Sequence, residues 1–302
     1  MKKKNDLLIG CLCATGCEFF YGLSYGFTKD ATDVASPFAL LGWRFLLAAA
    51  AMSLLVLIGA VKVNWKGKPR LPLLRVALCS PCIYFICETL GIRLTTASET
   101  GVFFACFPVV SLTASALLLK KLPTRRQLAG ICITLAGVLA TVLAVGVTSS
   151  LSVPGYALLL AALVSFSLYS VSVEKAPMYT GAELTYGMLL AGAALFVPLA
   201  LADGAVHGTA EELLFLPLRS RPFLSAVLFQ GLGCSIGAFF LCNVALAKIG
   251  VIRTASFIGV STVVSILDGA LLLGERFTVP QAIGAAVILA GVYVANSGKR
   301  LE

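Results

Sequence analysis

Three side chains near the N-terminus would place a carboxylate and two phenols on one face of a helix. Glu18 is followed by Tyr21 and Tyr25, three and seven residues later, and residues at these spacings are neighbours on a helix surface. The segment Leu7–Thr28 is otherwise apolar, and Glu18 would lie about 16 Å along it at 1.5 Å per residue. A carboxylate beside aromatic rings can bind an ammonium group by charge and by cation–π contact. Alternatively, Glu18 pairs with Arg44 and fixes how the helices pack.

A basic side chain follows an aromatic one in the second apolar segment, where Trp43 precedes Arg44. A guanidinium can hold a carboxylate through two parallel hydrogen bonds, so Arg44 could bind an acidic group of a solute. It could equally neutralise Glu18, Glu88 or Glu99, and the sequence favours this pairing role. A charged group inside a membrane is costly, which makes each of these residues a functional candidate.

Two carboxylates, Glu88 and Glu99, flank the turn between the third and fourth apolar segments. Tyr84 precedes Glu88 by four residues, so the two share a helix face. The carboxylates could form a vestibule that gathers cations or protons, or they could be solvated residues at helix ends. The sequence leaves both interpretations open.

Polar residues also form two stripes at helical spacing within later apolar segments. One stripe consists of Thr254, Ser261, Ser265 and Asp268, and the other of Ser165, Tyr169 and Ser172. Small polar side chains hydrogen-bond between helices inside a membrane, so each stripe should face a cavity or a neighbouring helix. Gln230 is a further cavity candidate, whereas Asn243 is expected to serve helix–helix contact. Hydrogen bonding between helices alone could explain either stripe.

The composition identifies the solvent around these residues as lipid. Hydrophobic residues make up 59% of the 302 residues and charged residues 12%, with a mean hydropathy of +0.97. Soluble domains carry about 25% charged residues. Ten segments are long enough to cross a hydrocarbon layer of about 30 Å. They are Leu7–Thr28, Pro37–Ile58, Leu73–Ile92, Ala97–Leu119, Gln127–Val147, Pro154–Val173, Glu183–Ala202, Pro222–Ala247, Val251–Leu273 and Val279–Asn296.

The basic residues predict the orientation of these segments. Most of the 23 Lys and Arg residues precede the first segment or lie in alternate loops, and the positive-inside rule then places both termini in the cytoplasm. The same distribution accounts for the net charge of +9, so no nucleic-acid partner is expected. The longest outer loop, Asp203–Arg221, could form a lid or a surface helix, but the sequence favours a plain linker.

Metal-binding and nucleotide-binding patterns are missing from the sequence. All ten cysteines fall within apolar segments, where cysteine behaves as a small hydrophobic residue. The CxxC spacing of Cys79 and Cys82 has no second pair, and the only histidine, His207, lies in an outer loop. No HExxH or phosphate-loop motif occurs. We therefore expect no metal, no cofactor, no enzymatic activity and no direct use of ATP.

The second half of the chain repeats the first. Residues 127–138, QLAGICITLAGV, match residues 281–292, QAIGAAVILAGV, which predicts one repeat over residues 1–149 and another over 150–302. Each half has an odd number of spans, so the second copy must cross the membrane in the opposite direction. Inverted repeats build secondary transporters with the binding site between the halves. The recurring glycines, Gly130, Gly137, Gly284 and Gly291, are expected to let helices approach closely.

The chain resembles the EamA branch of the drug/metabolite transporter superfamily over nearly its whole length. The resemblance rests on ten spans in two fivefold repeats, on the stretch Arg44-Phe-Leu-Leu-Ala, on Thr95-Thr-Ala-Ser98 leading into Pro108, and on Leu273-Gly-Glu275-Arg-Phe-Thr278. The chain departs from the family pattern at three places. Lys120-Lys121 replaces the usual Gly-Glu, Thr262 stands where the first repeat has Pro108, and Tyr21-Gly22 stands for Trp-Gly.

The resemblance implies an all-α membrane protein with ten transmembrane helices in two inverted five-helix repeats. Spans 1–4 and 6–9 would surround a cavity, with spans 5 and 10 outside it. The expected function is alternating-access transport of a small metabolite, such as an amino acid or an amine, across the cytoplasmic membrane, with export the commoner direction and proton coupling an option. The alternatives are an importer of a quaternary amine or a nucleotide-sugar-like solute, and a non-transporting scaffold or sensor. The candidate binding or coupling residues are Glu18, Tyr21, Tyr25, Trp43, Arg44, Tyr84, Glu88, Glu99, Tyr169, Gln230, Ser261, Ser265 and Asp268.

Overall fold

The apolar segments fold almost entirely as helices. The computed structural model describes residues 2–95, 100, 103–104, 106–145, 152–271 and 279–297. The first half contains α1 (Lys2–Thr32), α2 (Pro37–Leu57), α3 (Arg70–Ala77), η1 (Leu78–Ile83), α4 (Tyr84–Arg93), α6 (Phe107–Leu119) and α7 (Arg125–Val145). The second contains α8 (Val153–Glu174), α9 (Gly181–His207), α10 (Ala210–Arg219), α11 (Arg221–Leu228), η2 (Phe229–Ala238), α12 (Phe239–Ala255), α13 (Gly259–Leu271) and α14 (Val279–Asn296).

Seven helical stretches of the described chain are long and apolar enough to cross a membrane. They are Asn5–Thr32, Pro37–Leu57, Arg70–Arg93, Arg125–Leu143, Val153–Glu174, Gly181–His207 and Arg221–Ala255. Three shorter apolar helices, Phe107–Leu119, Gly259–Asp268 and Gln281–Asn296, coincide with the remaining predicted spans. The predicted all-α, ten-span membrane fold is thus confirmed.

Local sequence signals determine where several helices begin. Ser36 precedes Pro37, and its side chain accepts a hydrogen bond from the Ala39 amide at 3.1 Å. This N-cap satisfies one of the amides that a helix start leaves unpaired, and proline suits the first helical position. In α9, Thr180 and Glu183 form a reciprocal capping box.

The linker expected over Asp203–Arg221 is wrong, because its centre forms α10. Leu213 of this helix is buried, while Leu214 and Leu218 are exposed. Glu211 and Glu212 occupy its first turn, where carboxylates favour the positive end of the helix dipole. The apolar and acidic residues together specify a short amphipathic helix, which is the surface helix that the sequence left as the alternative to a linker.

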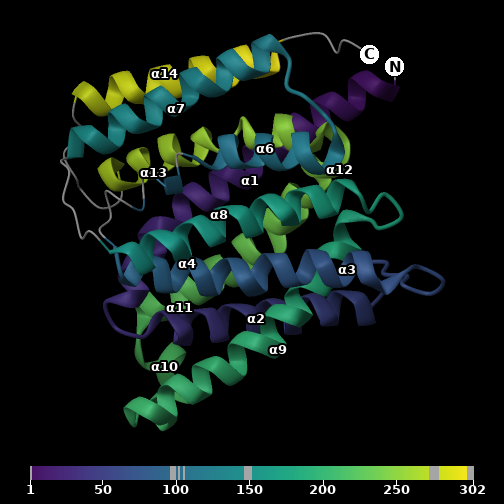
Figure 1. Ribbon diagram of the computed structural model, residues 1–302. Helices are drawn as coiled ribbons and strands as arrows, with labels where there is room; N and C mark the ends of the chain where they lie inside the picture. The colour runs from purple at the N-terminus through teal and green to yellow at the C-terminus, as the bar shows by residue number, and fades with distance from the viewer. Residues whose placement is uncertain are drawn as a thin grey trace.

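Elements from the two halves of the chain alternate in space. α1 packs against α12, α13 and η2, α2 against α9, and α4 against α8. Figure 1 shows these pairs stacked below α7 and α14, with α9 toward the lower edge. The space between the halves therefore runs along the interior, where polar residues of both can meet.

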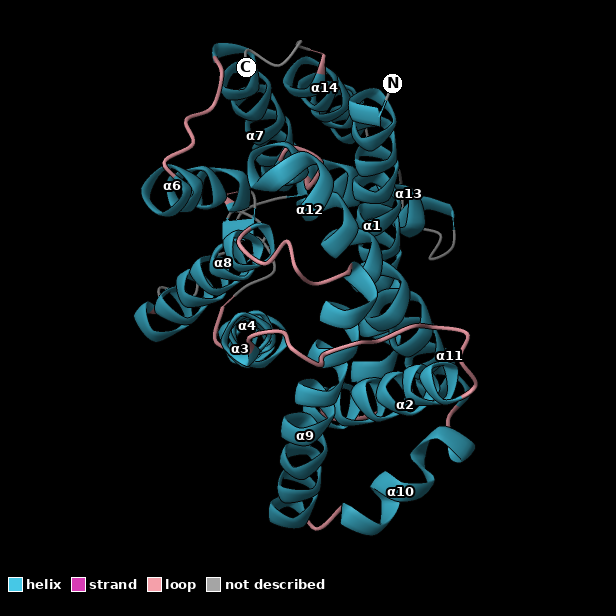
Figure 2. Cartoon of the chain, turned by 90° about the vertical axis from the view of Figure 1, so that its right-hand side faces the viewer, coloured by secondary structure: helices cyan, strands magenta, loops and turns pink. Residues whose placement is uncertain are grey.

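Helices α7 and α14 form a close pair at one edge of the molecule, and α9 and α10 lie at the opposite edge (Figures 1 and 2). A Cβ on Gly130 would come within 2.4 Å of the Ala295 amide nitrogen, and one on Gly291 within 2.5 Å of the Thr134 amide nitrogen. The backbones therefore touch where the glycines recur, and the predicted helix-approach role of these glycines is confirmed.

We predict that Gly291→Val destabilises the protein by about 1–3 kcal/mol, because added atoms would overlap backbone that cannot move aside. Ala290→Val, at an exposed neighbouring position of α14, is the matched control and should change little. Thermal unfolding of the two purified variants measures the difference. Equal melting temperatures would contradict the close backbone contact.

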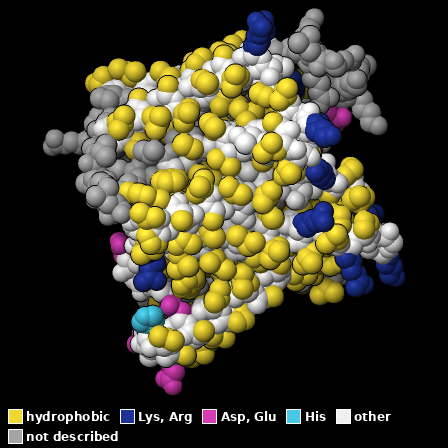
Figure 3. Space-filling view, in the orientation of Figure 1, with side chains coloured by type: hydrophobic (Ala, Val, Ile, Leu, Met, Phe, Trp, Pro, Cys, Tyr) yellow, Lys and Arg dark blue, Asp and Glu magenta, His cyan; other side chains and the backbone are white. Residues whose placement is uncertain are grey.

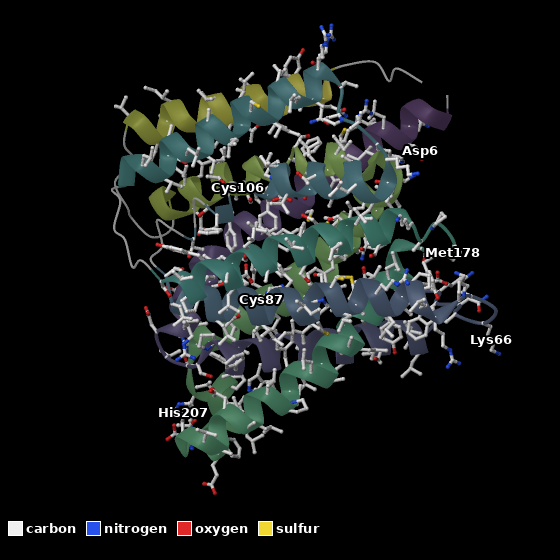
Figure 4. All side chains as sticks on the ribbon, in the orientation of Figure 1. Asp6, Lys66, Cys87, Cys106, Met178 and His207 are labelled. Carbon is white, nitrogen blue, oxygen red and sulfur yellow. The ribbon has the colours of Figure 1, made fainter. Side chains whose placement is uncertain are left out.

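Charged side chains separate to the two ends of an apolar surface. Figure 3 shows hydrophobic side chains covering the face, with most Lys and Arg at one end and Asp, Glu and His mainly at the other. Figure 4 places Lys66 at the first end and His207 at the second. We call the first the basic end, defined by Lys66, Lys68, Lys121 and Lys248, and the second the His207 end. This distribution is the one expected of loops on the two sides of a bilayer.

Candidate functional site

The third and eighth spans are both interrupted near their middles, at equivalent places in the two halves. In the third span, Ser80 is extended (φ −142°, ψ 124°) and precedes Pro81 within η1. The Ser165 hydroxyl donates to the Cys79 carbonyl oxygen at 2.8 Å, which satisfies a backbone group near the break. In the eighth span, residues Phe229–Ala238 form the π-helix η2. Irregular helices of this kind mark binding sites in membrane transporters.

Glu18 of α1 lines a small internal cavity between the two halves. The side chain is 6% exposed and contacts Ser261 of α13, whose hydroxyl donates to the Ile258 carbonyl oxygen at 2.6 Å. The cavity also meets Ser111, Ser170, Cys242 and Thr254. Its volume of about 10 Å³ leaves room for about one water molecule. The cavity beside Glu18 is therefore small, and polar residues from both halves line it.

A layer of thiols and phenols lies beside Glu18. The Cys17 thiol lies against Tyr21 and Cys242, and Cys242 also contacts Tyr169. The Tyr169 hydroxyl donates to Asn243 Oδ1 at 2.8 Å. Tyr21 and Tyr169 therefore both belong to this layer beside Glu18. The Tyr169 hydroxyl already donates its hydrogen bond to Asn243.

Asn243 is the centre of a buried hydrogen-bonded network. Besides accepting from Tyr169, it donates from Nδ2 to Thr185 Oγ1 at 3.0 Å, and it is fully buried. Buried amides are stable only when their donors and acceptors are satisfied. Its place in this network agrees with the predicted helix-packing role.

Arg44 of α2 lies in a cage of neutral groups. Its Nε donates to Ser235 Oγ at 2.6 Å, and its Nη1 donates to Gln230 Oε1 at 3.0 Å. The guanidinium carbon is 4.8 Å from the ring centre of Phe85 and 5.4 Å from that of Phe45. These are cation–π distances. The side chain is 5% exposed, so η2 and the aromatic rings fix it in position.

No carboxylate among the described residues forms an ion pair with Arg44, so the direct pairing with Glu18 or Glu88 that the sequence favoured is not found. The guanidinium of Arg44 nevertheless lies close enough to Glu88 for the two groups to attract each other electrostatically. Gln230, which accepts from Arg44, donates from Nε2 to Thr28 Oγ1 at 2.7 Å. A guanidinium has five N–H donors, and the two that Ser235 and Gln230 engage leave the outer fork of Arg44 available.

The remaining candidate residues make separate contacts away from the Arg44 guanidinium. Glu88 is partly buried and accepts a hydrogen bond from the Tyr84 hydroxyl at 2.6 Å, as their shared face predicted. Asp268 is 6% exposed and packs against Gly26 of α1, while Ser265 is partly buried. Trp43 points its indole to α10, where Nε1 donates to the Leu213 carbonyl oxygen at 2.8 Å. Glu99 and the side chain of Tyr25 lie outside the described residues.

Several residues around the site carried no sequence signal. Ser235 follows Gln230 by five residues, a spacing that an α-helix places on different faces and a π-helix brings closer together. Ser111 and Ser170 line the Glu18 cavity but are isolated serines in apolar runs. Cys242 has ordinary small-hydrophobic character in the sequence. The π-helix is the feature that could have pointed to Ser235, and it cannot be recognised from composition.

The sequence model of the EamA-like transporter family matches residues 8–143 and again residues 153–297. The chain belongs to the EamA-like transporter family. It is 32% identical to the uncharacterized transporter YcxC of Bacillus subtilis (strain 168), over 92% of this chain and 90% of that protein. It is 24% identical, over 93% of each chain, to a protein of Salmonella typhimurium (strain LT2) named a probable amino-acid metabolite efflux pump.

A solved crystal structure shares the fold of this EamA-family chain. The two superpose with a TM-score of 0.75 at 21% sequence identity, covering 97% of each chain. The double family match identifies a multi-pass membrane transporter built from two related halves, and the solved structure shows that the fold is shared. The family also implies a small-molecule substrate and a membrane environment.

Proposed function

We propose that this protein is a secondary active transporter that exports a small zwitterionic metabolite by alternating access. The observation that carries the proposal is a pair of opposite buried charges, Glu18 and Arg44, which lack an ion-pair partner among the described residues. A buried charge without a counter-charge is costly. A solute with an ammonium group and a carboxylate would supply both counter-charges.

The chemistry of each half of the site fits one end of such a solute. The Glu18 carboxylate, with the ring of Tyr21 nearby, suits an ammonium group. The outer fork of Arg44 suits a carboxylate through two parallel hydrogen bonds. The Salmonella relative named an amino-acid metabolite efflux pump agrees with this solute class and with export. The cavity is too small for an amino acid as it stands, so the halves must move apart to admit one.

A thermal-shift screen of the purified protein tests this solute class. An amino acid should raise the melting temperature, whereas its amide and its deaminated acid, each lacking one charge, should have little effect. Since a ligand stabilises the state that it binds according to its concentration over Kd, the shift should grow with solute concentration. Equal shifts with the zwitterion and with both singly charged analogues would contradict the proposal.

We also propose that residues 1–149 and 150–302 are the two transport repeats, and that the protein lies in the cytoplasmic membrane with both termini inside. The gathering of Lys and Arg at the basic end supports this orientation. The proposal includes no metal, cofactor or enzymatic step, and proton exchange at Glu18 is its coupling mechanism.

In a background from which the ten native cysteines have been removed, cysteines introduced at Lys66 and Thr209 should react with a membrane-impermeant thiol reagent from opposite sides. Both positions are exposed, and they belong to the basic end and the His207 end. In intact cells, Thr209→Cys should be labelled, and Lys66→Cys should be labelled only after the membrane is opened. Labelling of Lys66→Cys in intact cells would overturn the orientation.

A further inference from the structure

An open vestibule lies at the basic end of the molecule, next to the Glu18 cavity. It is a different region from the one that Glu88 and Glu99 were expected to form. Its volume is about 1360 Å³. Five cationic side chains from both halves line it, and Glu174 is the one carboxylate among its described lining residues. The cations are Lys121, Arg125, Arg126, Lys248 and Arg253; of these, Lys248 also forms an ion pair with Asp6 of α1. A cleft lined by one sign of charge raises the local concentration of oppositely charged solutes.

Two apolar side chains separate this vestibule from the Glu18 cavity. Leu246 and Val251 of α12 belong to the walls of both spaces, and each is 1% exposed. Gly250, immediately before Val251, has φ +77° and interrupts the helical path of α12. Positive φ is readily adopted by glycine, so this break is a natural place for the wall to move.

Glu174, at the end of α8, connects this wall to the other half of the chain through an ion pair and a hydrogen bond. Its Oε1 forms an ion pair with Lys121, which follows α6 of the first half. Its Oε2 accepts a hydrogen bond from the Val251 backbone amide at 2.7 Å. The Lys121 side chain is 61% exposed and that of Glu174 12%. An ion pair open to water on one side is weak and exchangeable, which suits a contact that must break in each transport cycle.

We propose that the vestibule is a loading site for the anionic group of the solute, and that Glu174 is the internal carboxylate which this group displaces from Lys121. Once Glu174 leaves Lys121, its hydrogen bond to the Val251 amide can also break. The wall formed by Leu246 and Val251 can then open toward Glu18. This inference rests on the proposed function, since it takes the Glu18 cavity to be part of the transport path. It adds a second anion site, distinct from Arg44, and a ligand-operated gate.

The native Cys242 thiol reports opening of this gate, because it lines the closed cavity and is 3% exposed. The probes are two methanethiosulfonates of similar size, the anionic sulfonatoethyl and the cationic trimethylammonioethyl reagent. The full-length protein in lipid nanodiscs is treated with each, and mass spectrometry locates and times the label on Cys242. Neither probe depends on knowing the transported solute.

Glu174→Gln and Lys121→Gln both break the ion pair, so each should raise the labelling rate of Cys242 several-fold over wild type. Their charge effects oppose each other. The anionic-to-cationic rate ratio should rise in Glu174→Gln and fall in Lys121→Gln, with a difference of about tenfold, at the low end of electrostatic steering. Lys175→Gln removes one positive charge, as Lys121→Gln does, but from an exposed side chain outside the vestibule. Its labelling rate and its rate ratio should match those of wild type.

Labelling of Cys242 at the wild-type rate in both variants would overturn the gate. Equal anionic-to-cationic ratios in the two variants would overturn the loading site. Because the two substitutions predict opposite ratios, a general loosening of the fold cannot imitate the expected result. A failure here leaves the Glu18–Arg44 proposal intact, since that proposal is tested by solute binding and flux.

Discussion

Arg44→Lys is expected to lower transport of a zwitterionic solute at least about tenfold while the protein remains folded. Lysine keeps the positive charge but lacks the planar fork that holds a carboxylate at two points. It also cannot reach Ser235 and Gln230 together in the geometry of the guanidinium, whose donors contact them at 2.6 and 3.0 Å. A tenfold effect corresponds to about 1.4 kcal/mol, within the range of one charge-assisted hydrogen bond.

Arg93→Lys provides the matched control, because Arg93 is an exposed arginine at the end of α4. Flux of the zwitterion in proteoliposomes should be unchanged in this variant. The effect at Arg44 should appear mainly in the solute concentration needed for half-maximal flux, since the lost contact is to the bound solute. Wild-type flux at all concentrations in Arg44→Lys would show that Arg44 is structural.

Glu18→Gln is expected to remove the response of transport to a pH gradient, or to stop transport, without preventing folding. The amide has nearly the volume of the carboxyl group and can keep the contact with Ser261, but it cannot take up or release a proton. Removal from water favours the neutral form of a carboxyl group, so Glu18 can alternate between binding a proton and binding the ammonium of the solute. The second role needs the ionised form, which makes the two events mutually exclusive.

The comparison is made in proteoliposomes with an imposed pH gradient, with Glu211→Gln in α10 as the control of equal charge change. Wild type and the control should respond to the gradient alike. A Glu18→Gln variant with wild-type rate and wild-type pH response would make Glu18 a structural residue. The coupling site would then be sought at Glu88, Glu99 and Asp268.

The sequence predicted the fold well because the signals for it are local or recur in the chain. Apolar length gave the ten spans, and the repeated glycines gave the α7–α14 contact, since small residues are what close helices require. The kink at Gly250 was missed, and helix α10 was given only as the less favoured alternative to a linker. In the first case the apolar pattern continues through Gly250, and in the second the short amphipathic helix lies in a segment with the composition of a loop.

The site was predicted only where a charge stood out against an apolar background. Glu18 and Arg44 are conspicuous for that reason, and both are buried between the halves. The partners of Arg44 were only half recognised, because the π-helix brings Ser235 and Gln230 toward the same guanidinium. Trp43 was expected at the site, but its indole contacts α10. Such pairings depend on how helices far apart in the sequence meet, which no local pattern records.

Solute counterflow in proteoliposomes tests the central claim most directly. Vesicles loaded with an excess of the unlabelled amino acid selected by thermal shift are given a trace of the labelled solute outside. Wild-type protein should accumulate the label transiently, Arg93→Lys and Glu211→Gln should do the same, and Arg44→Lys should be strongly reduced. Accumulation that is equal in wild type, Arg44→Lys and Glu18→Gln, or absent from wild type with every zwitterion that stabilises it, would contradict a transport site formed by Glu18 and Arg44.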